Sequence, residues 1–509
     1  MELNEVIVVG EDHISLEMVI NVARGRAQVE ISADEPFRKR LEQSRAHLHK
    51  ALDGGVPVYG VTTGFGDSCG NRLSSNRTLD LGRNLLRYHM CGTGDPIGIE
   101  ETRAAMMCRL VCLARGYSGV SLALLEQFAD FLNAGITPVV PSQGSVGASG
   151  DLTPMAYIGA ALSGEWEVRY RGSRISASDA LRGAGLKPYT FGPKESLSIM
   201  NGTSIMTGIG TMAIEKSRAL LDAAVAATAL TLHGVAGHAH HFHQVLFEAK
   251  PFPGQKAVAS RLRSLLASVA PPPEATDLDA LQDPYSIRCA PHILGVLADS
   301  LDWISRWVEI EANSVSDNPI FHPESGEVLT GGNFYGGHLA MAMDALKVAL
   351  ASVADMSDRQ IALMVDPRFS RGLPDGLVNI EGEERELHHG FKGMQITASA
   401  LTAEALKNTM PAASFSRSTE SHNQDKVSLG TIAARDSAAM CGMVAQVLAI
   451  HLMVSSQACE IRGGLDSRPG LKTILESIRM VVPTTTNDRP MDADFNRLAE
   501  TIYDRRLFA

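Results

Sequence analysis

Long segments of this chain carry apolar side chains at the three- and four-residue spacing that places them on one face of a helix. From Ser15 onward this pattern dominates, and the segments are rich in Ala and Leu. Several are apolar over much of their circumference, as in helices that other helices or neighbouring subunits bury. The pattern therefore predicts a mainly α fold with a long central helical bundle. The expected long helices are residues 102–114, 121–134, 205–237, 290–314, 337–363 and 436–459.

Strand-like stretches are short and lie between turn residues, so we expect hairpins rather than a large sheet. They are VIVVGED near the N-terminus and residues 139–144, 167–175 and 327–334. A smaller, loop-rich N-terminal part should precede the bundle, with a boundary between Pro193 and Gly202. We predict an N-terminal domain of residues 1–199 and a bundle and oligomerisation domain of residues 200–509. The proline-rich stretch 271–276 is expected to be a stiff surface connector.

Composition and charge narrow the class of protein. The chain has 46 Lys and Arg against 57 Asp and Glu, a net charge of −11, which argues against nucleic acid as the main partner and favours a small molecule. The seven cysteines include no CxxC pair, as in reduced cytosolic proteins. The acidic N-terminus does not resemble a signal peptide, and no apolar run looks long enough to span a bilayer. We expect a soluble cytoplasmic protein without a membrane partner.

The most informative stretch is GSVGASGD, residues 144–151. If the amide nitrogen of Gly150 attacks the carbonyl of Ala148, the chain must bend tightly, and a residue without a side chain allows that approach. The hydroxyl of Ser149 can then leave as water. The product is a methylene conjugated with a new ring, an electrophile that no standard side chain provides. Taken alone, the same letters also fit a Gly-rich loop at the start of a helix.

The surrounding motifs favour the first interpretation. Ala148-Ser149-Gly150 inside GSVGASGDLTP resembles the triad that forms 4-methylidene-imidazol-5-one in the histidine, phenylalanine and tyrosine ammonia-lyases. Six further motifs similar to those of this family occur in its order and cover almost the whole chain: VYGVTTGFG, MNGTS, QDPYSIRC, SDNPIF, GGNF and HNQDKVS. The resemblance implies a fumarase/aspartase-like fold and a homotetramer whose active sites combine loops from different subunits. The length is similar to that of the compact bacterial members.

The resemblance also implies roles for motif residues. Tyr59 is the expected general base for the β-proton of the substrate, and its phenol, with an ordinary pKa of about 10, needs positive charge or dipoles nearby. Arg288 offers the planar fork that binds a carboxylate, with Asn318 assisting. Asn201 is expected to donate its amide to the ring oxygen. The expected catalytic set is Tyr59, Ala148, Ser149, Gly150, Asn201, Tyr285 and Arg288. Further residues expected in the substrate pocket are Gly66, Gln282 and Phe334.

Selectivity in this family is associated with a residue pair before a glycine: Phe-Leu in phenylalanine enzymes, His-Leu in tyrosine enzymes and Ser-His in histidine enzymes. Aligning His89-Met90 with His-Leu predicts tyrosine, whereas counting back from Gly92 aligns Tyr88-His89 with Ser-His. The pair departs from the family pattern in both registers. Histidine enzymes resemble one another in placing Glu at the position of Gln424. The dipeptide Asn423-Gln424 is similar to that of the tyrosine and phenylalanine enzymes. We therefore expect L-tyrosine as the substrate, with 4-coumarate and ammonia as products.

Other functions stay open. Phenylalanine, a ring-substituted phenylalanine or histidine could be the substrate, or a tyrosine 2,3-aminomutase could return ammonia to the β-carbon. A non-catalytic homologue that serves as a binding or scaffold protein is the alternative from a different class. A histidine-rich run suggests a metal site, but we expect no acidic partner beside it and no metal, because it matches no ligand motif of the family. Its members are His233, His238, His240, His241 and His243.

Overall fold

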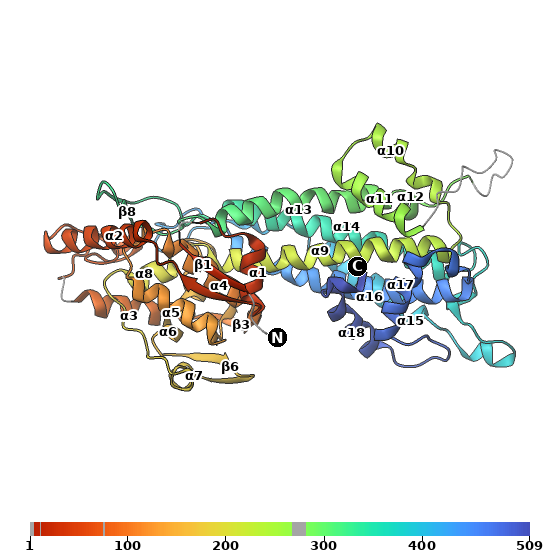
Figure 1. The fold of residues 1–509 in the computed structure, drawn as a ribbon, viewed down its shortest axis with the longest axis horizontal. Coiled ribbons are helices and arrows are strands. Elements are labelled where there is room, and N and C mark those ends of the chain that lie inside the picture. The colour runs from red at the N-terminus through yellow and green to blue at the C-terminus, as the bar shows by residue number, and fades with distance from the viewer. Residues whose placement is uncertain (1–4, 11, 75–76, 267–280, 509) are drawn as a thin grey trace. The chain divides into compact units, whose positions relative to one another are not determined.

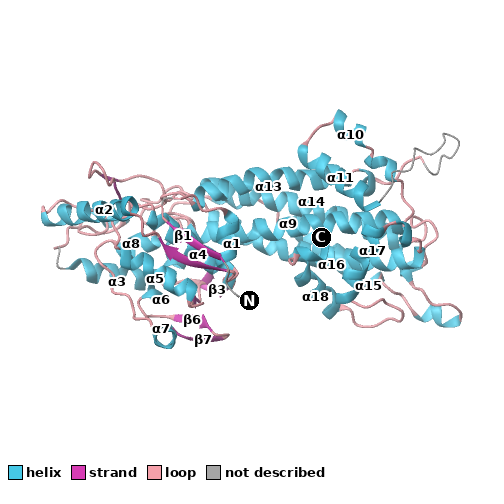
Figure 2. Ribbon diagram, in the orientation of Figure 1, coloured by secondary structure: helices cyan, strands magenta, loops and turns pink. Residues whose placement is uncertain are grey.

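A computed structural model describes residues 5–10, 12–74, 77–266 and 281–508 (Figure 1). The expected connector at residues 271–276 lies outside the described residues. Helices dominate the described chain (Figure 2), so the prediction of a mainly α fold is confirmed. The helices are α1 (Leu16–Ala23), α2 (Glu35–Asp53), α3 (Thr78–His89), α4 (Ile99–Ala114), α5 (Leu122–Asn133), α6 (Leu152–Leu162), α7 (Ala177–Ala184), α8 (Glu195–Met200), α9 (Ser204–Gly234), α10 (Gln244–Ala249), α11 (Pro253–Leu266), α12 (Tyr285–Arg288), α13 (Ala290–Ala312), α14 (Gly337–Val365), α15 (Lys392–Lys407), α16 (Gly430–Arg462), α17 (Pro469–Val481) and α18 (Asp492–Ile502).

Within the described residues, the strands are short and pair in four small sheets. They are β1 (Glu5–Val9), β2 (Ala27–Ile31), β3 (Thr93–Pro96), β4 (Thr137–Pro138), β5 (Pro141–Gln143), β6 (Glu167–Tyr170), β7 (Ser173–Ser176), β8 (Ile320–Phe321) and β9 (Val328–Leu329). The hairpin predicted at residues 167–175 is confirmed, because β6 and β7 are antiparallel neighbours. The stretch at 139–144 does not form the predicted hairpin, since β5 pairs with the distant β3. The parallel pairing of β1 with β2 was not predicted.

The chain divides into two compact units, each with more contacts between its own residues than with the other unit. Unit 1 comprises Met1–Ala213, Ser305–Asp344 and Pro411–Ala438, and unit 2 comprises Ile214–Ile304, Ala345–Met410 and Ala439–Ala509. Four of the boundaries fall inside the long helices α9, α13, α14 and α16. The expected N-terminal domain, residues 1–199, lies within unit 1. That unit also contains residues 200–213 and the segments Ser305–Asp344 and Pro411–Ala438, which the prediction places in the second domain.

Unit 2 is built from helices and has an apolar core. In this unit α9 packs on α16, where the Sγ of Cys459 donates to the carbonyl of Leu230 over 3.1 Å and the Nε2 of His451 lies 2.8 Å from the Oγ1 of Thr231. The other helices of unit 2 include α10, α11, α15, α17 and α18. Facing helices of unit 2 are thus linked by polar contacts as well as by apolar packing.

One sequence-based expectation about membranes is wrong. Helix α16 is long and apolar enough to cross a bilayer, with a mean hydropathy of 1.8 over an 18-residue window. Its charged side chains stand near its two ends, at Arg435, Asp436, Glu460 and Arg462, so the central stretch is uncharged. Because 72% of that window is buried inside the fold, the apolar composition of α16 is explained by its place in the core.

Candidate active site

A cavity of about 880 Å³ in unit 1 brings together most of the predicted site residues. Its wall combines residues of α3 with loops that precede or follow helices. Functional side chains commonly lie on such loops. Ala148 and Ser149 come from the loop before α6, and Asn201 follows α8 directly. The other predicted residues in the wall are Tyr59, Gly66, Tyr88, His89, Asn318, Phe334, Asn423 and Gln424.

Five predicted site residues do not line this cavity. Gly150 and Met90 adjoin lining residues in the chain but are absent from the wall. The other three, Gln282, Tyr285 and Arg288, belong to unit 2. There the Tyr285 side chain is 71% exposed, and the guanidinium carbon of Arg288 lies 4.5 Å from the centre of its ring. The expected carboxylate-binding group is therefore not among the unit 1 residues that line the cavity around Ser149.

The loop that carries Ser149 is bent and closely packed. Gly150 has a φ of +72°, and a Cβ added there would lie 2.0 Å from the carbonyl oxygen of Gly202. The backbone amide of Gly202 donates to the carbonyl oxygen of Ser149 over 3.1 Å, and the amide of Asp151 donates to the carbonyl of Gly202 over 2.7 Å. No residue with a side chain fits at position 150 without moving the backbone at Gly202.

Asp151 ties this loop to the starts of two long helices. Its Oδ2 accepts from the backbone amide of Met206 over 2.9 Å, near the start of α9, and its Oδ1 accepts from the hydroxyl of Thr431, near the start of α16. Burial raises the pKa of Asp151 to about 6, although these hydrogen bonds act in the opposite direction. The loop is also fixed by the amide of Leu429, which donates to the carbonyl of Val146 over 3.1 Å.

The hydroxyl of Tyr59 accepts a hydrogen bond from the backbone amide of Gly66 over 2.8 Å. Burial raises the pKa of Tyr59, and the carboxylate of Glu420 raises it further, whereas the Gly66 amide lowers it. The sequence predicts nearby groups that make this phenol more acidic. In one chain the net effect is instead to raise the pKa of Tyr59.

Glu420 is a cavity residue that the sequence analysis missed. Its Oε1 accepts from the backbone amide of Asp67 over 2.9 Å, and a Cβ added to Gly66 would lie 2.2 Å from its Oε2. Glu420 has a φ of +49° and the next two residues have φ values of +53° and +66°, a conformation that residues with side chains adopt rarely. A carboxylate three positions before Asn423 in the HNQD motif is the signal that could have identified it.

His89 lines the cavity, and a backbone contact fixes which of its ring nitrogens carries the hydrogen. Its Nδ1 lies 3.0 Å from the carbonyl oxygen of Leu85, which can only accept, so Nδ1 carries the hydrogen. Burial lowers the pKa of His89, which favours the neutral ring with a lone pair on Nε2. The ring of Tyr88 packs against it, with 4.2 Å between the ring centres. Elsewhere in the wall, the Nε2 of Gln424 donates to the Oγ of Ser149 over 3.4 Å.

Known proteins similar to this chain identify its family. A family profile described as Aromatic amino acid lyase matches residues 14–480. The chain belongs to the aromatic amino acid lyase family. Its relatives include a histidine ammonia-lyase of Myxococcus xanthus, 35% identical over 503 residues that cover 99% of this chain and 98% of that protein.

Solved structures of the aromatic amino acid lyase family share the fold. The tyrosine aminomutase from Streptomyces globisporus has a TM-score of 0.92 at 32% identity, covering 98% of this chain and 97% of that one. The phenylalanine aminomutase of Pantoea agglomerans has a TM-score of 0.92 at 30% identity, covering 98% and 99%. The predicted fumarase/aspartase-like fold and the prediction of a carbon–nitrogen lyase are confirmed.

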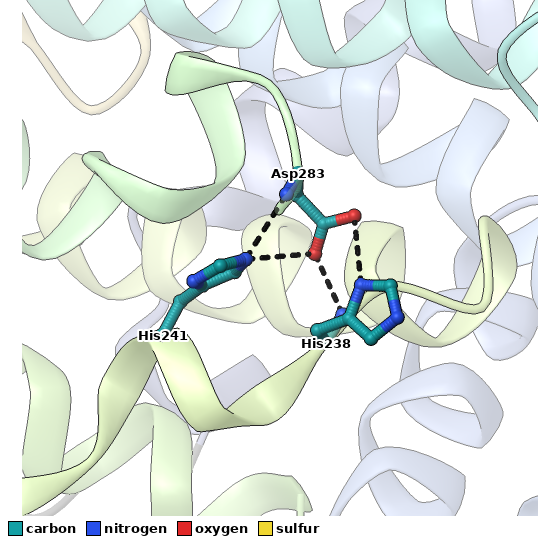
Figure 3. Close-up of side chains that lie close together, drawn as sticks. All are labelled: His238, His241 and Asp283. Carbon is teal, nitrogen blue, oxygen red and sulfur yellow. Dashed lines mark hydrogen bonds and ion pairs between the residues drawn. The ribbon is translucent and has the colours of Figure 1, made fainter. Parts of the chain in front are cut away.

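In this member of the family, the histidine-rich run has the acidic partner that the sequence analysis did not expect. Figure 3 shows Asp283 between His238 and His241. Its Oδ2 accepts from the backbone amide of His238 over 2.6 Å, and its own amide donates to the Nε2 of His241 over 3.0 Å. The partner was missed because it lies 45 residues from His238 in the chain.

Three potential ligand atoms of this cluster lie within 4.8 Å of one another. However, the Nη2 of Arg371 already lies 2.8 Å from the Oδ1 of Asp283, and a guanidinium there repels a cation. Burial lowers the pKa of His241 to about 4, and the lone pair of its Nε2 is used by the amide of Asp283. The geometry favours an anchor for the start of α12 over a metal centre, and the absence of a metal stays a prediction.

Proposed function

We propose that this lyase removes ammonia from L-tyrosine to give 4-coumarate, in the cavity around Ser149. The observation that carries the choice of substrate is the tautomer of His89, a residue that lines the cavity. Its Nε2 is an acceptor, and the phenol of tyrosine has a hydrogen to donate, whereas the ring of phenylalanine has none. Gln424 supports the choice, because the resemblance associates a Glu at that position with imidazole substrates.

We also propose that Ala148, Ser149 and Gly150 cyclise to 4-methylidene-imidazol-5-one. The residues fit this group: Ala148 and Ser149 line the cavity, and Gly150 leaves open the space that a Cβ would fill beside Gly202. The amide of Gly202 donates to the carbonyl oxygen of Ser149, the atom that becomes the ring oxygen. When formed, the group supplies an electrophilic carbon for the amine of the substrate.

Tyr59 is the proposed base for the β-proton. The Gly66 amide, 2.8 Å from the phenol oxygen, stabilises the phenolate that proton removal requires. Phe334 and Leu85 contribute apolar wall to the same cavity.

Arg288, Tyr285 and Gln282 are proposed to bind the substrate carboxylate in the cavity of a neighbouring copy. The resemblance implies a homotetramer with active sites built from different subunits. Apolar side chains that are more than half exposed on α13 and α14 support such an assembly. They are Val296, Ile310, Met341 and Val348. A cytoplasmic location, without nucleic acid or membrane as partner, completes the proposal.

A steady-state comparison of tyrosine, phenylalanine, histidine and ring-substituted phenylalanines tests the substrate. We expect the highest kcat/KM for tyrosine, and histidine with the highest value would overturn the choice. Histidine is the second candidate, because curated relatives at 34–37% identity carry the name histidine ammonia-lyase and an imidazole N–H can also donate to His89. Because a tyrosine aminomutase shares the fold, an aminomutase activity should also be tested. Chiral analysis of the products over time would detect β-tyrosine.

A further inference from the structure

The side-chain amide of Asn201 has its nitrogen held by two acceptors. Its Nδ2 lies 2.9 Å from the backbone carbonyl oxygen of Asn318 and 3.3 Å from the Oδ1 of Asp317. A carbonyl and a carboxylate can only accept, so the two hydrogens of the amide must face them. This chemistry decides which end of the amide is nitrogen, a choice that atomic positions alone often leave undecided.

The oxygen of the same amide is left for the cavity. Within the part of the chain that the structure describes, the Oδ1 of Asn201 has no hydrogen-bond partner, and Asn201 lines the cavity with Ser149. The sequence analysis expected Asn201 to donate to the ring oxygen. The backbone amide of Gly202 already donates to that atom, the carbonyl oxygen of Ser149, over 3.1 Å. Asn201 is therefore an acceptor where a donor was expected.

A buried ion pair keeps this orientation in place. The Nζ of Lys194 lies 2.5 Å from the Oδ2 of Asp317, and both side chains are 0% exposed. Burial alone would raise the pKa of Asp317, but the Lys194 ammonium holds it below its ordinary value, so the carboxylate stays ionised. Lys194 precedes α8 and Asn201 follows it, so one carboxylate contacts both ends of the same short helix.

We propose that the Oδ1 of Asn201 accepts a hydrogen bond from the amino group of the substrate, and that Asp317 is the positioning residue that turns this oxygen toward it. The inference rests on the proposed function, because an amino-acid substrate brings an amine to Ser149. An amine has hydrogens to donate, whereas a carboxylate has none and would meet repulsion from a carbonyl oxygen. Asn201 thus distinguishes the amino group of the substrate from its carboxylate, and it places the amino group beside Ser149.

Binding without turnover tests this role. In a Ser149→Ala background we would measure Kd by calorimetry for matched pairs of ligands that differ only in the amine. The pairs are tyrosine with 3-(4-hydroxyphenyl)propionate, phenylalanine with 3-phenylpropionate, and histidine with 3-(imidazol-4-yl)propionate. Adding Asn201→Ala should weaken the amino acid about tenfold, as expected for a hydrogen bond to a charged group, and its amine-free partner less than about twofold. An equal loss for both members, or no loss, would overturn the proposal.

A second variant separates an acceptor from a donor. Asn201→Asp keeps an oxygen toward the cavity. Beside the ionised Asp317 its carboxyl should be protonated and donate to that carboxylate, so we expect it to retain the preference for the amine-bearing ligand. If Asn201 acts as a donor, Asn201→Asp will lose that preference as Asn201→Ala does. Asn84→Ala, which removes another amide from the cavity wall, is the matched control and should leave the ratio within each pair unchanged. Thermal unfolding of each variant verifies that it folds.

The same binding measurements test the choice of substrate and the role of Asn201 separately. Which pair binds most tightly tests the choice of tyrosine, whereas the ratio within a pair tests Asn201. If histidine binds best, the proposed substrate fails while the ratio still tests the amine contact.

Discussion

The hydroxyl of Tyr59 accepts a hydrogen bond from the backbone amide of Gly66, 2.8 Å away, in a wall of the cavity where Glu420 is the nearby carboxylate. The amide stabilises the phenolate, and burial together with the carboxylate opposes it. Because these opposing effects leave the pKa of Tyr59 above its ordinary value, the phenol is protonated at neutral pH in this environment.

The first prediction follows from that balance. If Tyr59 acts as a base, only its deprotonated form is active, so kcat/KM should rise with pH on the alkaline side. Glu420→Gln removes a negative charge that raises the pKa of Tyr59, so the rise should occur at lower pH in the variant. A pH profile of kcat/KM measures the shift. A profile that moves to higher pH, or a Tyr59→Phe variant with unchanged activity, would contradict the assignment.

The second prediction concerns ring formation at Gly150. A Cβ there would lie 2.0 Å from the carbonyl oxygen of Gly202, so Gly150→Ala should prevent the bend and abolish activity. Cyclisation and dehydration remove two water molecules, so intact mass should show this loss in the wild-type chain and not in the variant. Gly172→Ala is the matched control, since Gly172 also has a positive φ, +78°, but has no atom within 4 Å of an added Cβ. Full mass loss in Gly150→Ala would refute the argument.

The third prediction concerns stability in acid. The hydroxyl of Thr231 donates to the carbonyl of Ala227, so it must accept from the Nε2 of His451, and the buried Nδ1 has no partner within the described chain. Burial lowers the pKa of His451 to about 3. The unfolded chain gains this proton below about pH 6.5, so the free energy of unfolding should fall as pH drops from there, by about 1.4 kcal/mol per pH unit.

Urea unfolding at pH 7 and pH 5 measures this effect. His451→Gln should remove about 2 kcal/mol of the loss between these pH values. His243→Gln, at an exposed position, is the control and should leave the loss unchanged. An equal loss in wild type and His451→Gln would show that His451 is not the group that titrates.

The fourth prediction concerns the anchor at Asp283. Asp283→Ala removes the contacts that hold the segment before α12, so Arg288 should lose its position. We expect KM for the substrate to rise several-fold while the loss of two waters at Ser149 stays complete. Asp366→Ala, which removes an exposed pair with Arg368, is the matched control. An unchanged KM would separate this cluster from the active site, and loss of activity after treatment with a chelator would support a metal there instead.

Much of the fold could be predicted from the sequence because the long helices have local causes. Helix α5 begins where Ser121 accepts from the amide of Leu124, and the expected bounds 121–134 are close to those observed. The pairing of β3 with β5 could not be predicted, because no local pattern links strands so far apart. The contact of Asp283 with His238 was missed for the same reason.

In the candidate site too, local motifs could be predicted from the sequence and contacts between distant residues could not. Family motifs located the residues around Ser149, but they did not indicate the direction of a side chain. Asn201 was expected to donate to the ring oxygen, whereas its hydrogens face Asp317 and the carbonyl of Asn318. Orientation of this kind depends on neighbours more than a hundred positions away in the chain, so only a three-dimensional structure supplies it.

The late segment Pro411–Ala438 of unit 1 has a consequence for biosynthesis. Leu429 donates to Val146 and Ser428 donates to Gly147, so the bent loop is fully braced only after the ribosome has translated most of the polypeptide. Maturation of Ser149 would then be a late, post-translational event. A nascent or prematurely terminated product that ends before Pro411 would keep an ordinary serine at that position.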